Sequence, residues 1–283
     1  MSNEAKEPTV QVPLPDGSQL EVTLTEVDDA GAPVLIVWPA FGAKARFYGQ
    51  LARALAARGI ASAVVEWRGQ GGSTPRVDRD ASFGYHDLAS VDAPAVTAAV
   101  RAARPHSPLV LLGHSLGGHV STLYATTHPG EVDGLILVGS ASPYFRGYGW
   151  TGIPRSYIGT SFMALTSRVV GYWPGDRLKF WGRQSTVLIR DWSRLSRTGR
   201  WQPAGADVDY ENAMETAQLD VLTISIEGDP LAPVKAVHAL TDRLRSARVT
   251  SWHSARRVGH IQWVRNHDEI LDRIEQWLKV TVA

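Results

Sequence analysis

A serine flanked by glycines stands where an apolar segment gives way to a helical one. The residues Gly113-His114-Ser115-Leu116-Gly117 follow the apolar run 108–112 and precede a helix-like stretch over 116–127. A strand, a sharp turn and a helix are the setting that a G-x-S-x-G nucleophile turn requires. The N-terminal N–H groups of the helix favour negative charge that develops near the serine hydroxyl. We therefore predict that Ser115 is a nucleophile rather than an incidental serine in a glycine-rich turn.

A catalytic serine needs a base and an acid that orients the base, and the acid is expected after one of the last strands of the chain. A serine hydroxyl is a poor nucleophile near neutral pH unless a base accepts its proton and an acid orients that base. With this kind of turn the chain order is Ser, then Asp or Glu, then His. Asp229 directly follows the predicted strand 221–226, and Glu227 is the reserve candidate. The alternative role of Asp229 is to cap the helix that begins near Pro233.

The base is predicted at His260, one of nine histidines. It follows the last predicted strand, 249–252, and precedes the closing helix. His253 lies on or at the end of that strand, and His267 lies at the start of the helix, where exposure to solvent is expected. These three histidines follow one another at intervals of seven residues, across a strand and a loop, and this spacing does not form a metal site.

Two backbone N–H groups should hold the negatively charged oxygen of an acyl-transfer intermediate. One is expected from Leu116, the residue after the nucleophile. The other should come from the loop after the apolar strand 34–38, which reads Pro39-Ala40-Phe41-Gly42. In this loop we select Phe41, with Ala40 as the alternative.

Alternating strands and helices must position these residues. An antiparallel hairpin is predicted over residues 10–24, with its turn at Pro15-Asp16-Gly17-Ser18. The later elements alternate, which indicates an α/β protein with a mostly parallel sheet and helices on both faces. The predicted strands are 34–38, 60–65, 109–112, 135–138, 221–226 and 249–252, and the predicted helices are 48–58, 87–103, 116–127, 233–245 and 268–279.

A segment from Ser140 to about Glu215 interrupts this alternation. It holds more than half of the chain's aromatic residues, with helical patterns over 154–170 and 184–197. We interpret it as a mainly helical cap over the C-terminal edge of the sheet, where open α/β sheets bind ligands. Its aromatic residues would line a substrate pocket or form the cap's own small core. The predicted division is a core of residues 1–139 and 216–283 and an inserted cap, or lid, of residues 140–215.

One stretch of the predicted cap is basic. Between Arg177 and Arg200 there are seven basic residues, including Lys179, and one acid, Asp191. These side chains could attract a substrate with a carboxylate or phosphate group, or an acidic partner. Such a run is more often a solvated surface, and this is the interpretation that we prefer.

The composition is that of an ordinary soluble globular protein. The chain has 283 residues, 44% hydrophobic and 20% charged, and a net charge of +1, which gives no reason to expect a nucleic-acid partner. The chain has no cysteine, which excludes disulfides and thiolate chemistry. His114 and His119 are five residues apart, a spacing that does not place two metal ligands on one face of a helix. No signal-peptide pattern is visible, and no apolar run approaches the ~20 residues of a membrane span. We expect a cytoplasmic protein without metal or cofactor, and the oligomeric state stays open.

Together these motifs resemble the α/β-hydrolase superfamily, over nearly the whole of residues 34–277. The stretch 66–73 (EWRGQGGS) is similar to the superfamily's Asp-x-Arg-Gly-x-Gly-x-Ser loop, with Glu66 in place of Asp, whereas Pro39-Ala40-Phe41-Gly42 replaces the usual His-Gly-x-Gly. The resemblance implies an α/β-hydrolase fold and a serine hydrolase.

A narrower resemblance is to a poorly characterised group of bacterial predicted α/β hydrolases. It rests on Ala40-Phe41-Gly42 followed by Phe47-Tyr48, and on Gly171-Tyr172-Trp173-Pro174-Gly175 together with Trp192. The group's Gly-His-aromatic ending is only partly matched by Gly259-His260-Ile261. This resemblance implies no particular substrate.

These observations predict a serine hydrolase with a Ser-His-Asp triad that cleaves a carboxylic ester of a small acyl substrate. Thioester, lactone, amide or C–C bond cleavage uses related parts, so the fold does not decide the reaction. Epoxide and haloalkane hydrolysis are disfavoured because they use an aspartate at the nucleophile turn. One alternative is a hydrolase-derived binding protein with slow turnover. Another is a dinucleotide-binding oxidoreductase, suggested by Gly69-Gln70-Gly71-Gly72, but Thr74 occupies the place of the third glycine and no helix pattern begins there.

Overall fold

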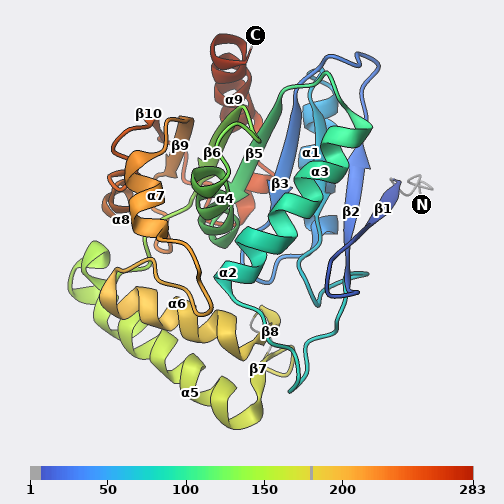
Figure 1. Ribbon diagram of the computed structural model, residues 1–283. Helices are drawn as coiled ribbons and strands as arrows, with labels where there is room; N and C mark the ends of the chain where they lie inside the picture. Colours follow the sequence, from blue (N-terminus) through green and yellow to red (C-terminus); the bar gives the residue numbers. More distant parts are fainter. Residues whose placement is uncertain (1–7, 179–180, 283) are drawn as a thin grey trace, which may run out of the picture.

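An eight-stranded sheet forms the centre of the structure, a computed structural model that describes residues 8–178 and 181–282 (Figure 1). The strand order is β1-β2-β4-β3-β5-β6-β9-β10. The hairpin strands β1 (Thr9–Pro13) and β2 (Gln19–Thr25) are antiparallel, and β2 is antiparallel to β4. All later neighbours pair in parallel. The parallel strands are β3 (Val34–Trp38), β4 (Ala61–Val65), β5 (Leu109–His114), β6 (Gly134–Val138), β9 (Asp220–Ile226) and β10 (Arg248–Ser254).

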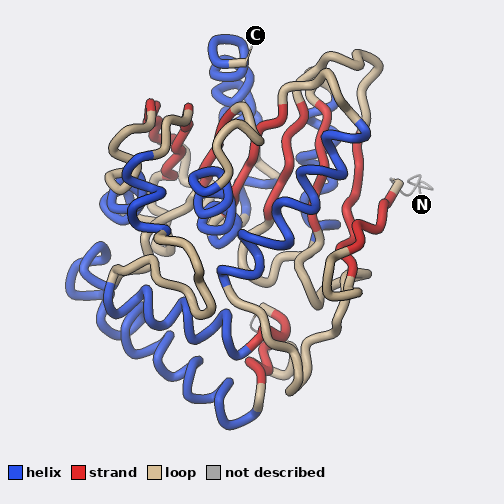
Figure 2. Tube along the Cα trace, viewed as in Figure 1, coloured by secondary structure: helices blue, strands red, loops and turns tan. Residues whose placement is uncertain are grey.

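Helices cover both faces of this sheet, as Figure 2 shows, so the central strands are buried on both sides. All five residues of β3 are buried, which explains its unbroken apolar sequence. Its side chains alternate between two cores, with Ile36 in one and Leu35 in the other. On the Leu35 side lie α1 (Gly49–Ala56) and α9 (Asp268–Thr281), and on the Ile36 side lie α3 (Ala93–Ala103) and α4 (Leu116–Thr127). The predicted mostly parallel sheet with helices on both faces is confirmed.

Two predicted helices differ from the expected bounds. The helix predicted over 87–103 begins earlier, because the short helices α2 (Tyr85–Asp87) and η2 (Leu88–Asp92) run without a break into α3. Pro94 therefore lies inside a helical stretch, directly after the wider π-type turn in which the N–H of Ala93 donates to the carbonyl oxygen of Leu88. The helix predicted over 233–245, here α8 (Val234–Thr241), is shorter. The chain turns after Thr241, whose carbonyl accepts a hydrogen bond from the N–H of Leu244.

Most of the residues between β6 and β9 leave the sheet, and α5 (Thr160–Val170), α6 (Thr186–Thr198), β7 (Tyr172–Gly175) and β8 (Gly182–Ser185) form a layer of their own beside it (Figure 1). The predicted helical patterns correspond to η4 (Ile153–Gly159), α5 and α6. The structure adds a short antiparallel hairpin, a helix that packs against α4, and a short helix near the start, none of which was predicted. These are β7 with β8, α7 (Tyr210–Thr216), and η3 (Phe145–Thr151). No helix within the described residues has the length and apolar character needed to cross a membrane.

Candidate active site

Ser115 lies in the tight turn between β5 and α4. Its backbone has φ 55° and ψ −115°, a conformation that residues with a side chain rarely adopt. A Cβ at Gly113 would lie 2.3 Å from the Cα of Gly118, and one at Gly117 would lie 2.0 Å from the carbonyl oxygen of Trp38. The two flanking glycines therefore allow α4 to begin directly against β3 and β5.

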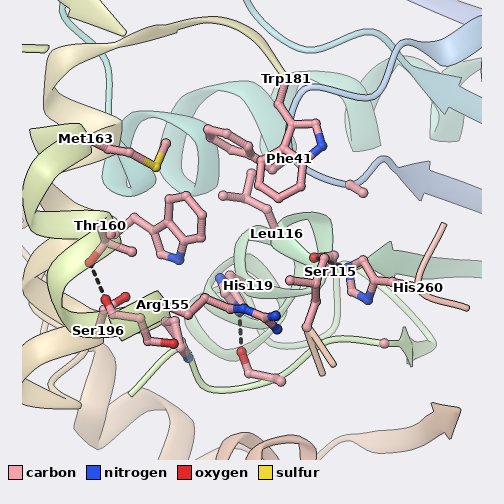
Figure 3. A pocket seen from close by; sticks show the side chains of 18 of the residues that line it. Phe41, Ser115, Leu116, His119, Arg155, Thr160, Met163, Trp181, Ser196 and His260 are labelled. Carbon is pink, nitrogen blue, oxygen red and sulfur yellow. Dashed lines mark hydrogen bonds between the residues drawn. The ribbon is translucent and has the colours of Figure 1, made fainter. Parts of the chain in front are cut away.

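Ser115, His260 and Asp229 form one hydrogen-bonded chain, and Figure 3 shows the first two side by side at the edge of a cavity. Nε2 of His260 lies 2.9 Å from Oγ of Ser115, and Nδ1 of His260 lies 2.7 Å from Oδ2 of Asp229. His260 and Asp229 are both buried. This is the geometry in which an imidazole can accept a proton from a hydroxyl group while a carboxylate fixes the ring.

The second carboxylate oxygen of Asp229 holds the local turn. Its Oδ1 accepts hydrogen bonds from the N–H groups of Leu231, at 2.8 Å, and Ala232, at 3.0 Å. The helix that follows begins only at Val234. The N-cap of α8 is Pro233 and no side chain caps it, so Asp229 does not cap that helix. One of its carboxylate oxygens stabilises the turn before the helix, and the other faces the imidazole of His260.

The reserve candidates lie away from this chain of contacts. Glu227 accepts hydrogen bonds from His253 and Arg257 at the surface, and these two contacts lower the pKa of its carboxyl group. His267 precedes α9, with Nδ1 2.9 Å from the carbonyl oxygen of Val264. Neither Glu227, His253 nor His267 is hydrogen-bonded to Ser115 in the described part of the chain.

Two backbone N–H groups beside Ser115 could hold an oxyanion. Leu116 is the first residue of α4, so its N–H has no acceptor within the helix. The N–H of Ala40 donates to Oη of Tyr48 at 2.8 Å, whereas among the described residues no hydrogen bond involves the N–H of Phe41. Phe41 and Leu116 both line the cavity beside Ser115 (Figure 3). The geometry therefore favours Phe41 over Ala40.

Two buried histidines lie beside the site, and neither was predicted to have a role there. His114 is fully buried, with Nδ1 2.7 Å from Oη of Tyr48 and Nε2 2.9 Å from the carbonyl oxygen of His260. Burial lowers its pKa well below 6.5, so the ring is neutral. The signal that could have indicated this role is a histidine next to the nucleophile, inside an otherwise apolar strand.

His119 lies on the first turns of α4 and lines the cavity. Its Nδ1 is 2.9 Å from the hydroxyl of Tyr85, and its Nε2 is 2.7 Å from the carbonyl oxygen of Ala141. Burial lowers the pKa of His119 to about 4. The neutral ring thus donates from Nε2 to Ala141 and accepts at Nδ1 from Tyr85.

The cavity in front of Ser115 has a volume of about 720 Å³ and a mainly apolar wall. Its lining includes the aromatic side chains Phe41, Phe162, Trp173, Trp181 and Trp192. Polar groups are few. Those contributed by η4, α5 and α6 are Arg155, Ser156, Thr160 and Ser196. Such a cavity suits a small or medium-sized molecule with a largely apolar body.

The described basic side chains of the run between Arg177 and Arg200 do not line this cavity. Arg155 is the only arginine or lysine among the described residues that line the cavity, and it lies outside this run. Its side chain donates a hydrogen bond to the carbonyl oxygen of Pro230 at 2.6 Å. Arg183 pairs with Asp176, and Lys179 lies outside the described residues. The arrangement therefore favours the surface interpretation of the run.

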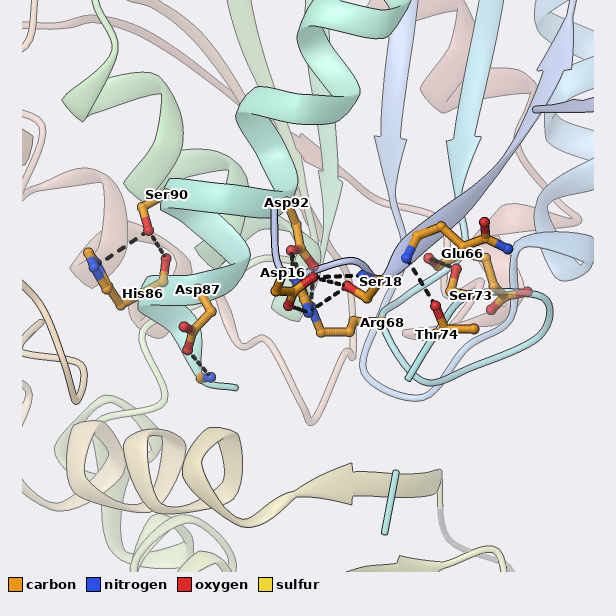
Figure 4. A network of polar contacts seen from close by, with 12 residues as sticks. Asp16, Ser18, Glu66, Arg68, Ser73, Thr74, His86, Asp87, Ser90 and Asp92 are labelled. Carbon is orange, nitrogen blue, oxygen red and sulfur yellow. Dashed lines mark hydrogen bonds and ion pairs between the residues drawn. The ribbon is translucent and has the colours of Figure 1, made fainter. Parts of the chain in front are cut away.

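The loop that follows β4 is structural (Figure 4). Arg68 is buried and pairs with the buried Asp92 and with Asp16 in the turn between β1 and β2. Oγ of Ser73 donates to the carbonyl oxygen of Glu66 at 2.8 Å and accepts from the N–H of Glu21 at 2.9 Å. These contacts join the loop to the opening hairpin and to η2.

The glycines of this loop face carboxylates. A Cβ at Gly71 would lie 2.5 Å from Oε2 of Glu66, and one at Gly72 would lie 2.3 Å from Oε2 of Glu21. The carboxyl groups of Glu66 and Glu21 fill the space beside these glycines that a pyrophosphate would need, which argues against dinucleotide binding. Glu66 itself is buried and accepts from the N–H of Ala45, and burial raises its pKa to about 7.

Fold and comparisons together define the class of protein as an α/β hydrolase. Residues 31–177, more than half of the chain, match the family described as serine aminopeptidase, S33. The chain belongs to this family.

The proteins that are similar in sequence differ in activity. A 1-acylglycerol-3-phosphate O-acyltransferase from Arabidopsis thaliana is 36% identical over 121 residues, which are 42% of this chain and only 28% of that protein. A pimeloyl-[acyl-carrier protein] methyl ester esterase from Aliivibrio salmonicida is 24% identical over 210 residues, covering 70% of this chain and 78% of the other.

Among solved structures, an esterase from Exiguobacterium antarcticum is similar with a TM-score of 0.66. It is 17% identical in sequence, and the match covers 96% of this chain and all of the other. At this identity the likeness shows a shared fold alone.

Proposed function

We propose that this protein cleaves carboxylic esters, or closely related acyl bonds, through an acyl-enzyme intermediate on Ser115. The observation that carries the proposal is the hydrogen-bonded chain from Ser115 to His260 to Asp229, which begins at a strained turn and opens into a cavity. In it Ser115 is the nucleophile, His260 the general base and Asp229 the group that orients the imidazole.

The first half of the reaction forms the acyl-enzyme. Oγ of Ser115 attacks the carbonyl carbon while its proton moves to Nε2 of His260, and Asp229 stabilises the resulting imidazolium. The carbonyl oxygen becomes an oxyanion, to which the N–H groups of Leu116 and Phe41 donate. The C–O bond to the alcohol then breaks as His260 returns the proton to the leaving oxygen.

The second half consumes water. A water molecule attacks the acyl carbon while His260 accepts one of its protons, and the oxyanion is held by the same N–H groups. When the bond to Ser115 breaks, the proton returns to Oγ and the carboxylic acid leaves. No metal or cofactor takes part in this scheme.

Residues 140–215 form the cap in this proposal, over a core of residues 1–139 and 216–283. The lining of the cavity supports it, because Ser115 and His260 come from the core while Met163, Trp173 and Trp192 come from the inserted segment. These side chains would hold an apolar acyl group next to the nucleophile. The names of the similar esterases from Aliivibrio and Exiguobacterium agree with ester cleavage.

Other acyl bonds stay open on the same residues. A thioester, a lactone or a C–C bond next to a carbonyl could be attacked by Ser115 with the same proton transfers. A hydrolase-derived binding protein with slow turnover would use the cavity without the chemistry. Substrate assays separate these alternatives.

The test compares hydrolysis of a p-nitrophenyl ester by three proteins. The wild type should turn over, Ser115→Ala should fall to the background rate, and Ser251→Ala, an exposed serine on β10, should equal the wild type. More than a few per cent of wild-type activity in Ser115→Ala would refute the proposed nucleophile. A wild type that binds esters without turnover would support the binding-protein alternative instead.

A further inference from the structure

Helix α5 presents an apolar face to solvent. Ile158 at the end of η4 and Phe162, Leu165 and Val169 on α5 are spaced by four, three and four residues, which places them on one side of a helix. Each of the four side chains is between 58% and 75% exposed. Figure 1 shows α5 at the outer side of the cap, against α6.

The opposite face of the same segment is buried and mostly polar. Its buried residues are Ser156, Thr160, Met163 and Ser167. The hydroxyl groups of Thr160 and Ser167 donate to backbone carbonyls one helical turn earlier, those of Ser156 and Ala164. A surface helix of a soluble protein normally buries its apolar face and exposes its polar face. Here the order is reversed, so something other than the protein's own core should cover the apolar face.

The apolar face continues towards the aromatic side chains of the preceding short helices. Trp150 in η3 is 84% exposed, and Ile153 and Tyr157 in η4 are also exposed. Exposed tryptophan together with leucine, isoleucine and phenylalanine is typical of protein segments that enter the interface between water and lipid.

Arginines border this face on the side of α6. A groove of about 310 Å³ between α5 and α6 is lined by Leu165 of the apolar face together with four arginines and one acid. The arginines are Arg168, Arg190, Arg194 and Arg197. The acid, Asp191, is buried and accepts hydrogen bonds from the N–H groups of Ala204 and Tyr85.

The sequence around the face contributes no compensating acid. From Ser142 to Gly175 the chain has no Asp or Glu, while Arg146, Arg155 and Arg168 fall within it and are exposed. A bilayer with acidic phospholipids presents anionic headgroups at its surface and apolar acyl chains beneath them. An apolar helix face bordered by arginines is complementary to both of these layers.

We propose that the outer face of α5, with Trp150 and the arginines beside it, binds the surface of membranes that contain anionic phospholipids. Ile158, Leu165 and Val169 enter the boundary between headgroups and acyl chains, and Arg168 and Arg190 contact lipid phosphates.

A second copy of this chain fits the face less well. In a two-fold symmetric contact both copies bring the same patch, so the arginines beside both faces would be brought into one interface. Like charges at such close range oppose association. An anionic lipid surface instead supplies the opposite charge.

The face is also continuous with the cavity in front of Ser115. Phe162 is exposed on the apolar face and at the same time lines that cavity, and Arg155 is both exposed and part of the lining. A bound membrane would therefore lie next to an opening through which an apolar molecule can pass between lipid and cavity.

The test uses the Ser115→Ala protein, so that lipid hydrolysis cannot affect the result and the outcome does not depend on the proposed function. Its sedimentation is measured with vesicles of phosphatidylcholine and phosphatidylglycerol, and with vesicles of phosphatidylcholine alone. Binding should be at least about tenfold stronger to the anionic vesicles and should weaken with added salt.

Two sets of substitutions test the face itself. Ile158→Ser/Leu165→Ser/Val169→Ser should reduce binding by at least about tenfold, because three buried apolar contacts are lost. The matched control, Val10→Ser/Val208→Ser/Val280→Ser, changes exposed apolar residues elsewhere and should bind as the parent does. Arg168→Gln/Arg190→Gln should lose the preference for anionic vesicles, whereas Arg245→Gln/Arg256→Gln, exposed arginines outside the cap, should keep it. Thermal unfolding checks that every variant is folded.

Three results would overturn the proposal. One is a parent protein that does not sediment with anionic vesicles. Another is equal binding by the apolar variant and its control. The third is a parent that is dimeric by light scattering and does not bind vesicles, and that becomes monomeric when the apolar face is changed, since the face would then lie between two copies.

Discussion

The hydroxyl of Tyr48 lies 2.7 Å from Nδ1 of His114 and also accepts a hydrogen bond from the N–H of Ala40. On its other side, His114 contacts the carbonyl oxygen of His260 at 2.9 Å and the indole N–H of Trp263 at 3.1 Å. In either neutral tautomer of His114 the contact with Tyr48 is a hydrogen bond. The pair thus joins the loop after β3, which carries the proposed oxyanion donor, to the loop that carries the proposed base.

Removing this hydroxyl should reduce both stability and turnover. Tyr48→Phe keeps the buried ring but leaves the N–H of Ala40 without an acceptor, a loss of about 1–3 kcal/mol in the free energy of unfolding. Because the two loops lose their link, kcat should fall more than KM changes. Tyr210→Phe is the matched control, since its hydroxyl also contacts a histidine, His86, and neither residue lines the cavity in front of Ser115. Equal kcat values for the two variants would contradict the positioning role of Tyr48.

The two carboxylates that follow β9 should differ sharply in their effect on turnover. Asp229→Ala removes the group that fixes the imidazole of His260 and should lower kcat by ~10³–10⁴, as for other residues in this role. Glu227→Ala removes a surface contact with His253 and Arg257 and should cost less than about tenfold, because an exposed ion pair contributes little. Steady-state kinetics on one ester measure both values. The opposite ranking would show that Glu227 is the orienting acid.

The apolar cavity should select acyl groups by length. Each further CH₂ buried in the cavity stabilises the bound state by ~0.8 kcal/mol, which is roughly fourfold in kcat/KM. A series of p-nitrophenyl esters from acetate upward should therefore rise over several carbons and fall once the volume of about 720 Å³ is filled. A flat series would mean that Trp173 and Trp192 are part of the cap's own core and do not contact the acyl chain.

Glu66 should make the folded state less stable as the pH rises. Burial raises its pKa from 4.5 to about 7, so the folded protein holds this proton more tightly than the unfolded chain does. The contribution to stability is present below pH 4.5 and is lost as the pH rises through 7; the shift corresponds to about 3 kcal/mol at most. Glu66→Gln cannot lose a proton, so its free energy of unfolding relative to the wild type should increase between these pH values.

Urea unfolding at several pH values measures this difference. Glu131→Gln, at an exposed position, serves as the control and should follow the wild type throughout. A Glu66→Gln protein whose stability runs parallel to the wild type at every pH would contradict the prediction.

The parallel sheet and the three proposed catalytic residues could be predicted from sequence for one physical reason. Strands buried on both faces, such as β3, appear as unbroken apolar runs, and the C-terminal ends of parallel strands meet at one edge of a sheet. Ser115 and Asp229 follow such buried strands, β5 and β9, whereas His260 follows the edge strand β10, which is mostly exposed. All three strands are parallel, so the proximity of the three residues could be inferred without knowledge of the helix packing.

The contacts that hold the site together could not be predicted in the same way. Tyr48 and His114 are 66 residues apart, and their hydrogen bond depends on how η1 (Ala45–Tyr48) packs against β5. The hairpin of β7 and β8 was missed because Gly171-Tyr172-Trp173-Pro174-Gly175 has no alternating pattern and resembles a turn. The pattern over 154–170 predicted a helix, but its periodicity did not reveal that the apolar side faces solvent.

The most direct test of the central claim is mass spectrometry of the protein after treatment with a fluorophosphonate. The reagent phosphonylates a serine only where a base activates it, so the wild type should gain one adduct, and peptide mapping should place it on Ser115. Ser196→Ala, which removes another hydroxyl from the same cavity, should still be labelled on Ser115, whereas Ser115→Ala should not be labelled at all. An unmodified wild type, or an adduct on a serine other than Ser115, would contradict the account.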